Sequence, residues 1–409
     1  MKYDFDKPID RTGTHSVKCD AMPSGVPQDA LSLWVADMDL PCAQPILDAL
    51  HQRIDRKIFG YTLYENDELK DAVTGWYQRH FGWIIDKSDL FYSPGVVPAI
   101  AFLINCLTEE ADGIIIQRPV YYPFTDTIEA NSRKVVNSPL LCSGNTYVMD
   151  FADLDEKFAE EKNKGMILCS PHNPVGRVWT EDELCKVVEI AKKYDKWIIS
   201  DEIHSDLTRS NIVHTPLLKL APEYSHRIIA CTAPSKTFNL AGIQFSNIII
   251  PNKEYQEKWN HFVSNRFSLG FCNPFGLTAI LAAYTQGDDW LTQVKAYIDS
   301  NIQYIEAFVA EHLPKAQVID CQATYLVWID LRGYCPDAKQ LKTLMQKEAG
   351  LAFDEGYIFG EEGAGYERIN VAAPRCIIEE CMNRMKNAIE HYEKTGLPDP
   401  IKKKLPLHK

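Results

Sequence analysis

Short apolar runs alternate with helical patterns through the middle of the chain. The runs occupy residues 113–117, 166–169, 197–199, 228–231 and 246–250. Between them lie patterns with helical spacing, one over 97–107 and one from the Thr180–Glu183 capping box to about residue 194. Continuous apolar runs separated by helices are typical of a sheet that is buried on both faces. The pattern therefore predicts an α/β fold with a mainly parallel central sheet and helices on both faces.

Towards both ends of the chain the pattern of apolar and polar residues is different. Residues 43–57 and 67–81 have helical spacing, with Asn66 as an N-cap, and residues 91–95 are predicted to be a turn. After residue 290 we expect a smaller α+β unit. In chain order, its predicted elements are a long helix (290–312), a strand of alternating apolar and polar residues (324–330), a helix, a short strand near 351, a strand (368–371) and a last helix to about 393. We therefore predict a large domain over 41–285 and a small domain over 286–409. The first forty residues (1–40) should pack with the small domain.

Composition narrows the class of protein. The chain has 409 residues with 45% hydrophobic and 24% charged residues, which is ordinary for a globular protein. A net charge of −13 argues against a nucleic-acid partner, because such sites need clustered Lys and Arg; the basic run 402–404 is interpreted as a solvated tail. Neither a membrane-spanning run nor a signal-peptide pattern is present, so we expect a cytoplasmic protein. The twelve cysteines contain no Cys-x-x-Cys pair and are interpreted as core residues; no metal site is expected.

Three of the apolar runs are followed by chemically useful side chains. Asn173 comes shortly after the run 166–169, Asp201 after 197–199, and Lys236 after 228–231. Open α/β sheets bind ligands at the carboxyl ends of their strands. A lysine beside a carboxylate and an amide suggests an amine that binds the aldehyde of pyridoxal phosphate (PLP). By itself Lys236 could be a surface lysine, and Asp201 could cap the next segment.

Further residues fit the other parts of such a cofactor. Gly95, Val96 and Val97 open a helix, whose free N–H groups can bind phosphate, although Pro-Gly before a helix is also common without a ligand. Ser235 and Thr232 offer hydroxyl groups to the same anion.

Two more side chains are candidates for the substrate end. Tyr121 follows a strand and can stack on the pyridine ring or simply pack in the core. Arg375 can clamp an amino-acid carboxylate with its guanidinium, or it can form a salt bridge between domains.

These motifs together resemble a known family. The sequence is similar to the fold-type I PLP enzymes of the aspartate aminotransferase superfamily, and more narrowly to the MalY/PatB-type cystathionine β-lyases (C–S lyases). The matching segments are 34–39, 59–62, 93–97, 119–121, 173–176, 200–204, 234–239 and 374–375. The likeness extends over nearly the whole chain.

The resemblance implies a role for each matching residue. Lys236 would bind the cofactor aldehyde and Asp201 the pyridine nitrogen. The remaining implied positions are Asn173 at the ring 3-oxygen, Tyr121 stacked on the ring, Gly95, Val96 and Ser235 at the phosphate, Arg375 at the substrate carboxylate, and Trp34 to Asp37 as a lid over the substrate. Tyr61 resembles a tyrosine that reaches the neighbouring subunit's phosphate, which implies a homodimer with shared active sites.

Two positions differ from the broader aminotransferase pattern. His204 stands where aminotransferases often carry a tyrosine at the cofactor 3-oxygen, and Gln244 stands where they carry a phosphate-binding arginine. Both changes are similar to the lyase subgroup. The resemblance therefore implies α,β-elimination from a sulfur amino acid such as cystathionine, giving a thiol, pyruvate and ammonia. A class I/II aminotransferase and a regulatory protein on the same scaffold are the alternatives.

Overall fold

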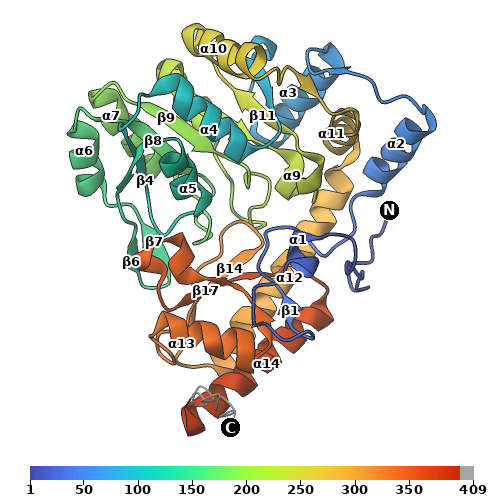
Figure 1. The fold of residues 1–409 in the computed structure, drawn as a ribbon, viewed down its shortest axis with the longest axis vertical. Helices are drawn as coiled ribbons and strands as arrows, with labels where there is room; N and C mark the ends of the chain where they lie inside the picture. Colours follow the sequence, from blue (N-terminus) through green and yellow to red (C-terminus); the bar gives the residue numbers. More distant parts are fainter. Residues whose placement is uncertain (397–409) are drawn as a thin grey trace, which may run out of the picture.

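A seven-stranded sheet forms the centre of the larger part of the molecule (Figure 1). The computed structural model describes residues 1–396, so the basic run 402–404 lies outside the described residues. The strands in spatial order are β3 (Leu90–Ser93), β11 (Ser246–Ile249), β10 (Ile228–Thr232), β9 (Trp197–Asp201), β8 (Asn163–Cys169), β4 (Gly113–Ile116) and β5 (Lys134–Asn137). Every pairing from β10 to β5 is parallel. The predicted α/β fold with a mainly parallel sheet is confirmed.

Alternate side chains of the strands pack into two separate hydrophobic cores. This arrangement explains why the strands contain continuous apolar runs. Ile114 and Ile116 of β4 pack into one core, and Ile115 packs into the other. The first core contains residues of α4 (Val96–Leu107), α5 (Pro123–Ala130) and α10 (Lys253–Trp259). The second contains residues of α3 (Asp67–Phe81), α6 (Phe151–Ala159), α7 (Glu181–Lys193) and α11 (Pro274–Gln286). Successive side chains of a strand point to opposite faces, so helices on both faces require both to be apolar.

Side-chain hydrogen bonds to backbone N–H groups stabilise the starts of two helices. The side chain of Asn66 accepts a hydrogen bond from the N–H of Leu69 at the start of α3. Thr180 and Glu183 form the expected capping box at the start of α7. These bonds satisfy N–H groups that have no partner within the helix.

One sequence prediction about this sheet was wrong, and one strand runs against the mainly parallel pattern. Residues 91–93 are part of strand β3 and not a turn. The run 246–250 forms β11, which is antiparallel to both of its neighbours. The chain between β10 and β11 contains only a four-residue helix, α9 (Pro234–Thr237), and a short 3-10 turn. A parallel return needs a crossover, usually a full α-helix that covers the sheet, and this connection is too short to provide one.

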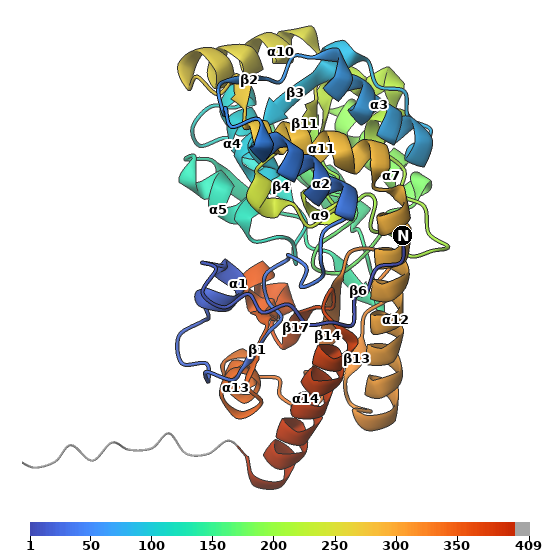
Figure 2. The same cartoon turned by 90° about the vertical axis from the view of Figure 1, so that its right-hand side faces the viewer.

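The C-terminal part is a second, smaller sheet with its own helices (Figures 1 and 2). Its antiparallel strands, in spatial order, are β13 (Gln317–Val318), β14 (Leu326–Asp330), β17 (Tyr366–Asn370) and β16 (Asp354–Glu355). Helices α12 (Asp288–His312), α13 (Ala338–Thr343) and α14 (Arg375–Thr395) belong to the same part of the molecule (Figure 2).

The N-terminal segment reaches this smaller part. Strand β1 (Leu31–Ser32) pairs in parallel with β15 (Leu351–Ala352). The exact division at residues 40 and 285 stays a prediction. Over residues 1–396, none of the helices has the length and apolar character needed to cross a membrane.

Candidate active site

A cavity opens at the carboxyl ends of β8, β9 and β10, where ligands bind in sheets of this type. It encloses about 740 Å³ of space between protein atoms, part of it open to solvent. Most of the residues predicted from the sequence line it: Gly95, Val96, Val97, Tyr121, Asn173, Asp201, His204, Ser235 and Lys236. Parallel neighbours bring these strand ends together, so the predicted convergence of lysine, carboxylate and amide is observed.

Lys236 lies on the four-residue helix α9, which begins directly after β10. Its Nζ donates a hydrogen bond to the backbone oxygen of Ala36, 2.7 Å away. The pKa of Lys236 is lowered to about 8, mainly by burial and also by the charge of Arg368, whereas the charges of Asp37 and Asp201 act in the opposite direction. A lysine with such a pKa has an appreciable neutral fraction near pH 8, and the neutral amine is the form that attacks an aldehyde.

Asp201 ends strand β9, lines the cavity and is buried. One of its oxygens accepts a hydrogen bond from the N–H of Ile203, at 3.1 Å. Burial raises the pKa of Asp201 to about 7, because that bond and the charge of Lys236 offset only part of the lost hydration. A cationic N–H placed beside this carboxylate would stabilise its charged form.

His204 lies near Asp201 on the loop after β9 and also lines the cavity. Burial and the nearby charges of Lys236 and Arg368 lower its pKa well below the ordinary value, so its imidazole is neutral. Its Nδ1 is buried without a hydrogen-bond partner among the described residues. A buried polar atom of this kind is costly unless a bound molecule satisfies it.

The start of α4 forms another wall of the cavity. Gly95 is the N-cap of this helix and has an extended backbone, with no side-chain cap on the first N–H groups. Ser235, Gln244 and Ser246 contribute polar side chains at the cavity wall. Uncapped N–H groups at the start of a twelve-residue helix suit a phosphate.

Thr232 does not join this group. Its hydroxyl donates to the backbone oxygen of Asn247 at 3.3 Å, and it does not line the cavity. Thr232 is the last residue of β10, where it still pairs with Asn247 of β11.

Arg375, predicted as the carboxylate clamp, is directed elsewhere. It begins α14, where its Nε donates to Asn301 and its Nη2 to Ser300, both on α12. Its guanidinium also lies over the ring of Tyr304. These contacts tie α14 to α12, and Arg375 does not line the cavity.

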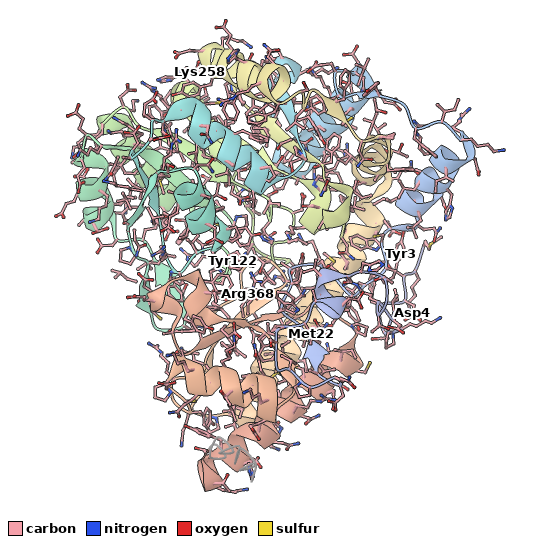
Figure 3. All side chains as sticks on the ribbon, in the orientation of Figure 1. Tyr3, Asp4, Met22, Tyr122, Lys258 and Arg368 are labelled. Carbon is pink, nitrogen blue, oxygen red and sulfur yellow. The ribbon has the colours of Figure 1, made fainter. Side chains whose placement is uncertain are left out.

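The arginine bonded to a cavity-lining residue is Arg368, on β17 (labelled in Figure 3), which the sequence analysis missed. Arg368 does not itself line the cavity. Its Nη1 donates to the side-chain oxygen of Asn173 at 3.0 Å, and its Nη2 donates to the backbone oxygen of Trp34 and to Asp354. The sequence carried one signal for it. A charged residue inside a strand is costly unless it is paired, and Arg368 heads the otherwise buried strand predicted at 368–371.

Residues 34–40 form a strap along the cavity, and side chains from several elements hold its backbone carbonyls. Ala36 lines the cavity, and its oxygen accepts bonds from Lys236 and Tyr325. Asn370 donates to the oxygens of Val35 and Asp37. The side chains of Trp34 and Asp37, predicted to cover the substrate, do not line the cavity and instead bond to Arg11 and Lys18.

For Trp34 that bond runs from Nε1 to the backbone oxygen of Lys18. Asp37 forms ion pairs with Arg11 and Lys18. Tyr61 lies further away, at the start of the exposed strand β2 (Thr62–Leu63), and 93% of its side chain is exposed. Within this one chain it does not line the cavity.

A family match covers most of the chain. Residues 29–380 match the model described as aminotransferase class I and II. The chain belongs to that family. It is 39% identical to the cystathionine β-lyase PatB of Bacillus subtilis over 94% of this chain and 99% of the relative. It is 32% identical to the protein MalY of Escherichia coli over 95% of this chain and 99% of that protein.

Solved structures of family members have the same architecture. A structure of cystalysin from Treponema denticola, described as containing a pyridoxal 5'-phosphate cofactor, superposes with a TM-score of 0.91 at 36% identity and covers 96% of this chain and 100% of its own. A PLP-bound putative aminotransferase from Clostridium difficile gives a TM-score of 0.92 at 39% identity over 95% of this chain and 100% of its own. The resemblance inferred from the motifs is confirmed.

The cavity's donor set fits such a cofactor. A lysine amine with a lowered pKa, a buried carboxylate and an uncapped helix start surround one space. These are the groups that an aldehyde, a pyridine nitrogen and a phosphate require.

Proposed function

We propose that the protein is a PLP-dependent C–S β-lyase that cleaves cystathionine or related cysteine S-conjugates. Water and the substrate would yield a thiol, pyruvate and ammonia. Similarity to PatB, named a cystathionine β-lyase, and to cystalysin supports this proposal. The single observation that carries it is the meeting of Lys236, Asp201 and Asn173 in one cavity, with Arg368 bonded to Asn173.

The cofactor is pyridoxal 5'-phosphate, and each part of it has a partner in the cavity. Lys236 would bind the aldehyde, Asp201 the pyridine nitrogen, and the N–H groups at the start of α4 with Ser235 the phosphate. Tyr121 would stack on the ring. When bound, the cofactor withdraws the electron pair that is left on Cα of an amino acid, which is chemistry that no side chain supplies.

The protein's own residues then bind the substrate and move its protons. Arg368 would bind the α-carboxylate, because it is the cation bonded to the cavity-lining Asn173. Lys236 Nζ, released as a free amine, would take the proton from Cα. Its lowered pKa, about 8, suits it to accept that proton and to give it to the leaving thiolate. The neutral imidazole of His204 adds no competing positive charge beside Lys236.

One experiment tests the proposal and separates it from the main alternative. Purified protein with PLP would be incubated with L-cystathionine and no keto acid. A lyase releases thiol and pyruvate in equal, continuously growing amounts, whereas an aminotransferase stops after one turnover per site. Replacement of Lys236 by Ala should abolish release, and normal turnover in that variant would contradict the proposal.

A class I/II aminotransferase is the second candidate, because the family contains both reactions and the same residues serve both up to proton removal. A regulatory protein on the same scaffold is less well supported, since the lysine, aspartate and arginine are all present in the cavity region. Purified protein without the yellow colour of bound PLP would favour the regulatory function.

The proposed functional unit is a homodimer in the cytoplasm. A patch of exposed apolar side chains lies around β2 and β12 (Phe271–Cys272), two strands that pair with each other. It includes Ile58, Phe59, Tyr61, Leu63 and Phe271. Contiguous exposed aromatic and aliphatic groups mark interaction surfaces. A second copy of the chain is the proposed occupant, because the patch contains Tyr61, the residue expected to reach the neighbouring site.

A further inference from the structure

Asp354 is the buried counter-ion of Arg368. The two residues face each other as register partners on neighbouring strands β16 and β17. Asp354 accepts a hydrogen bond from Arg368 Nη2, and their side chains are only 7% and 3% exposed. Asp354 therefore lies directly beside the arginine that would bind the substrate carboxylate.

Three of the five N–H groups of Arg368 already donate hydrogen bonds within the protein. A guanidinium has five N–H groups. Nη2 uses both of its groups, one on Asp354 and one on the oxygen of Trp34, and Nη1 uses one on Asn173. Nε is buried without a partner among the described residues.

This arrangement restricts how a carboxylate can bind. Both edges of a guanidinium that receive a carboxylate through two hydrogen bonds include Nη2, paired either with Nε or with Nη1. Because both N–H groups of Nη2 are occupied, neither edge is free. A substrate carboxylate can bind through two bonds only if it replaces Asp354 or the oxygen of Trp34.

The free-energy cost of losing each acceptor decides whether Asp354 or the Trp34 oxygen is displaced from Arg368. Breaking a buried ion pair leaves an uncompensated charge in the protein interior. Losing one hydrogen bond between a charged donor and a neutral carbonyl costs less free energy, because the carbonyl carries no net charge. Trp34 also belongs to the strap, whereas Asp354 is held in a strand pair.

We propose that the substrate carboxylate replaces the Trp34 carbonyl on Arg368 and shares the guanidinium with Asp354, whose negative charge limits the affinity for the substrate. This inference rests on the proposed function, because it takes Arg368 as the carboxylate site. Asp354 is a positioning residue, since it acts on the substrate through Arg368. Burial raises the pKa of Asp354, and the guanidinium lowers it.

The test uses the holoenzyme and 3-(methylthio)propionate. This ligand has the carboxylate and thioether of a cysteine S-conjugate but no amino group, so it binds without reacting with the aldehyde. Calorimetry gives its Kd for the unsubstituted protein, for Asp354→Asn and for Glu355→Gln. The asparagine oxygen can still accept from Nη2, so this change removes the charge and keeps the hydrogen bond.

Glu355→Gln is the matched control. It removes the same charge one residue further along β16, where Glu355 pairs with Lys342 and Gln346 instead of Arg368. We expect Asp354→Asn to tighten Kd about tenfold, which equals about 1.4 kcal/mol, and Glu355→Gln to change it less than about twofold. Equal effects of the two substitutions, or no tightening in Asp354→Asn, would overturn the inference.

A second measurement needs no variant, in case Asp354→Asn does not fold. A crystal structure of the unsubstituted holoenzyme with the same ligand should have the ligand carboxylate on Nη2, Asp354 still bonded and the Trp34 oxygen displaced. Displacement of Asp354, or binding away from Arg368, would contradict the inference. Neither measurement depends on turnover. A protein that failed the cystathionine assay could therefore still pass this test, and a protein that passed the assay could fail this test.

Discussion

Arg368 and Asn173, which are far apart in the sequence, are joined by a hydrogen bond of 3.0 Å between Nη1 and the side-chain oxygen. The bond connects the small sheet to the loop after β8, and Arg368 lies where the two parts of the molecule meet (Figure 3). An amide that touches both the cavity and the buried arginine can align a cofactor with a substrate carboxylate. In the proposed function, substrate recognition would therefore depend on both parts of the fold.

The first prediction separates Arg368 from Arg375. Arg368→Lys keeps the charge but loses the planar fork, and we expect KM for L-cystathionine to rise about 100-fold, equal to about 3 kcal/mol of lost charge-assisted bonding. Arg375→Lys, the matched control, should change KM less than about twofold, because Arg375 bonds to Asn301 and Ser300 outside the cavity. Steady-state kinetics measure both. A larger effect at Arg375 would restore the original sequence prediction.

The second prediction concerns the cost of burying Lys236. Its pKa in the folded protein, about 8, is below the value of about 10.4 for a free lysine. Between these values the unfolded chain binds more protons, so stability increases with pH, and below pH 8 the protonated amine destabilises the fold. Cofactor-free Lys236→Met should therefore have a higher Tm than the unsubstituted cofactor-free protein at pH 7, and the gain should shrink at pH 9.5.

Thermal unfolding at the two pH values measures this difference. Lys258→Met is the control, because Lys258 lies on the surface of α10 and pairs with Glu254 (Figure 3). Its Tm difference from the unsubstituted protein should be small and the same at both pH values. A gain for Lys236→Met that grew with pH would contradict the assigned direction of the pKa shift.

The third prediction concerns the ion pairs that hold the strap. Lys18 has a fully buried side chain, and its Nζ lies 2.6 Å from an oxygen of Asp39. Lys18→Met removes a positive charge that compensates the Asp39 carboxylate, so we expect a loss of about 3–5 kcal/mol in the free energy of unfolding. Lys193→Met breaks an exposed pair with Asp155 and should cost less than about 1 kcal/mol. Urea denaturation compares them, and similar losses would argue against a structural role of Lys18.

The fourth prediction tests the exposed apolar patch. Replacing Ile58 and Leu63 by Lys adds charge to a surface proposed to be covered by a second copy, so the protein should sediment as a monomer in analytical ultracentrifugation. Ile84→Lys is the control, since Ile84 is exposed outside the patch. Tyr61→Phe should weaken PLP binding without changing the sedimenting mass. An unsubstituted protein that sedimented as a monomer would refute the shared site.

Much of the site was predictable because it depends on strand ends. Buried runs in a parallel sheet finish at the same edge, so side chains that follow them meet wherever their strands are neighbours. Asp201 and Lys236 were found in this way, and β9 and β10 are indeed neighbours. Asn66 and the Thr180–Glu183 box were predictable because capping bonds join residues only three positions apart.

Sequence alone determined the α/β class, the strand ends that supply Lys236, Asp201 and Asn173, and the helix starts, because each depends on short-range periodicity and on neighbours along the chain. Only the tertiary structure decided that Arg368 and not Arg375 bonds to the cavity-lining Asn173, that Thr232 bonds to β11, and that β11 runs antiparallel. Those outcomes depend on which face of an element meets which partner. The order of strands and the packing of two sheets set that choice, and residues hundreds of positions apart contribute to it.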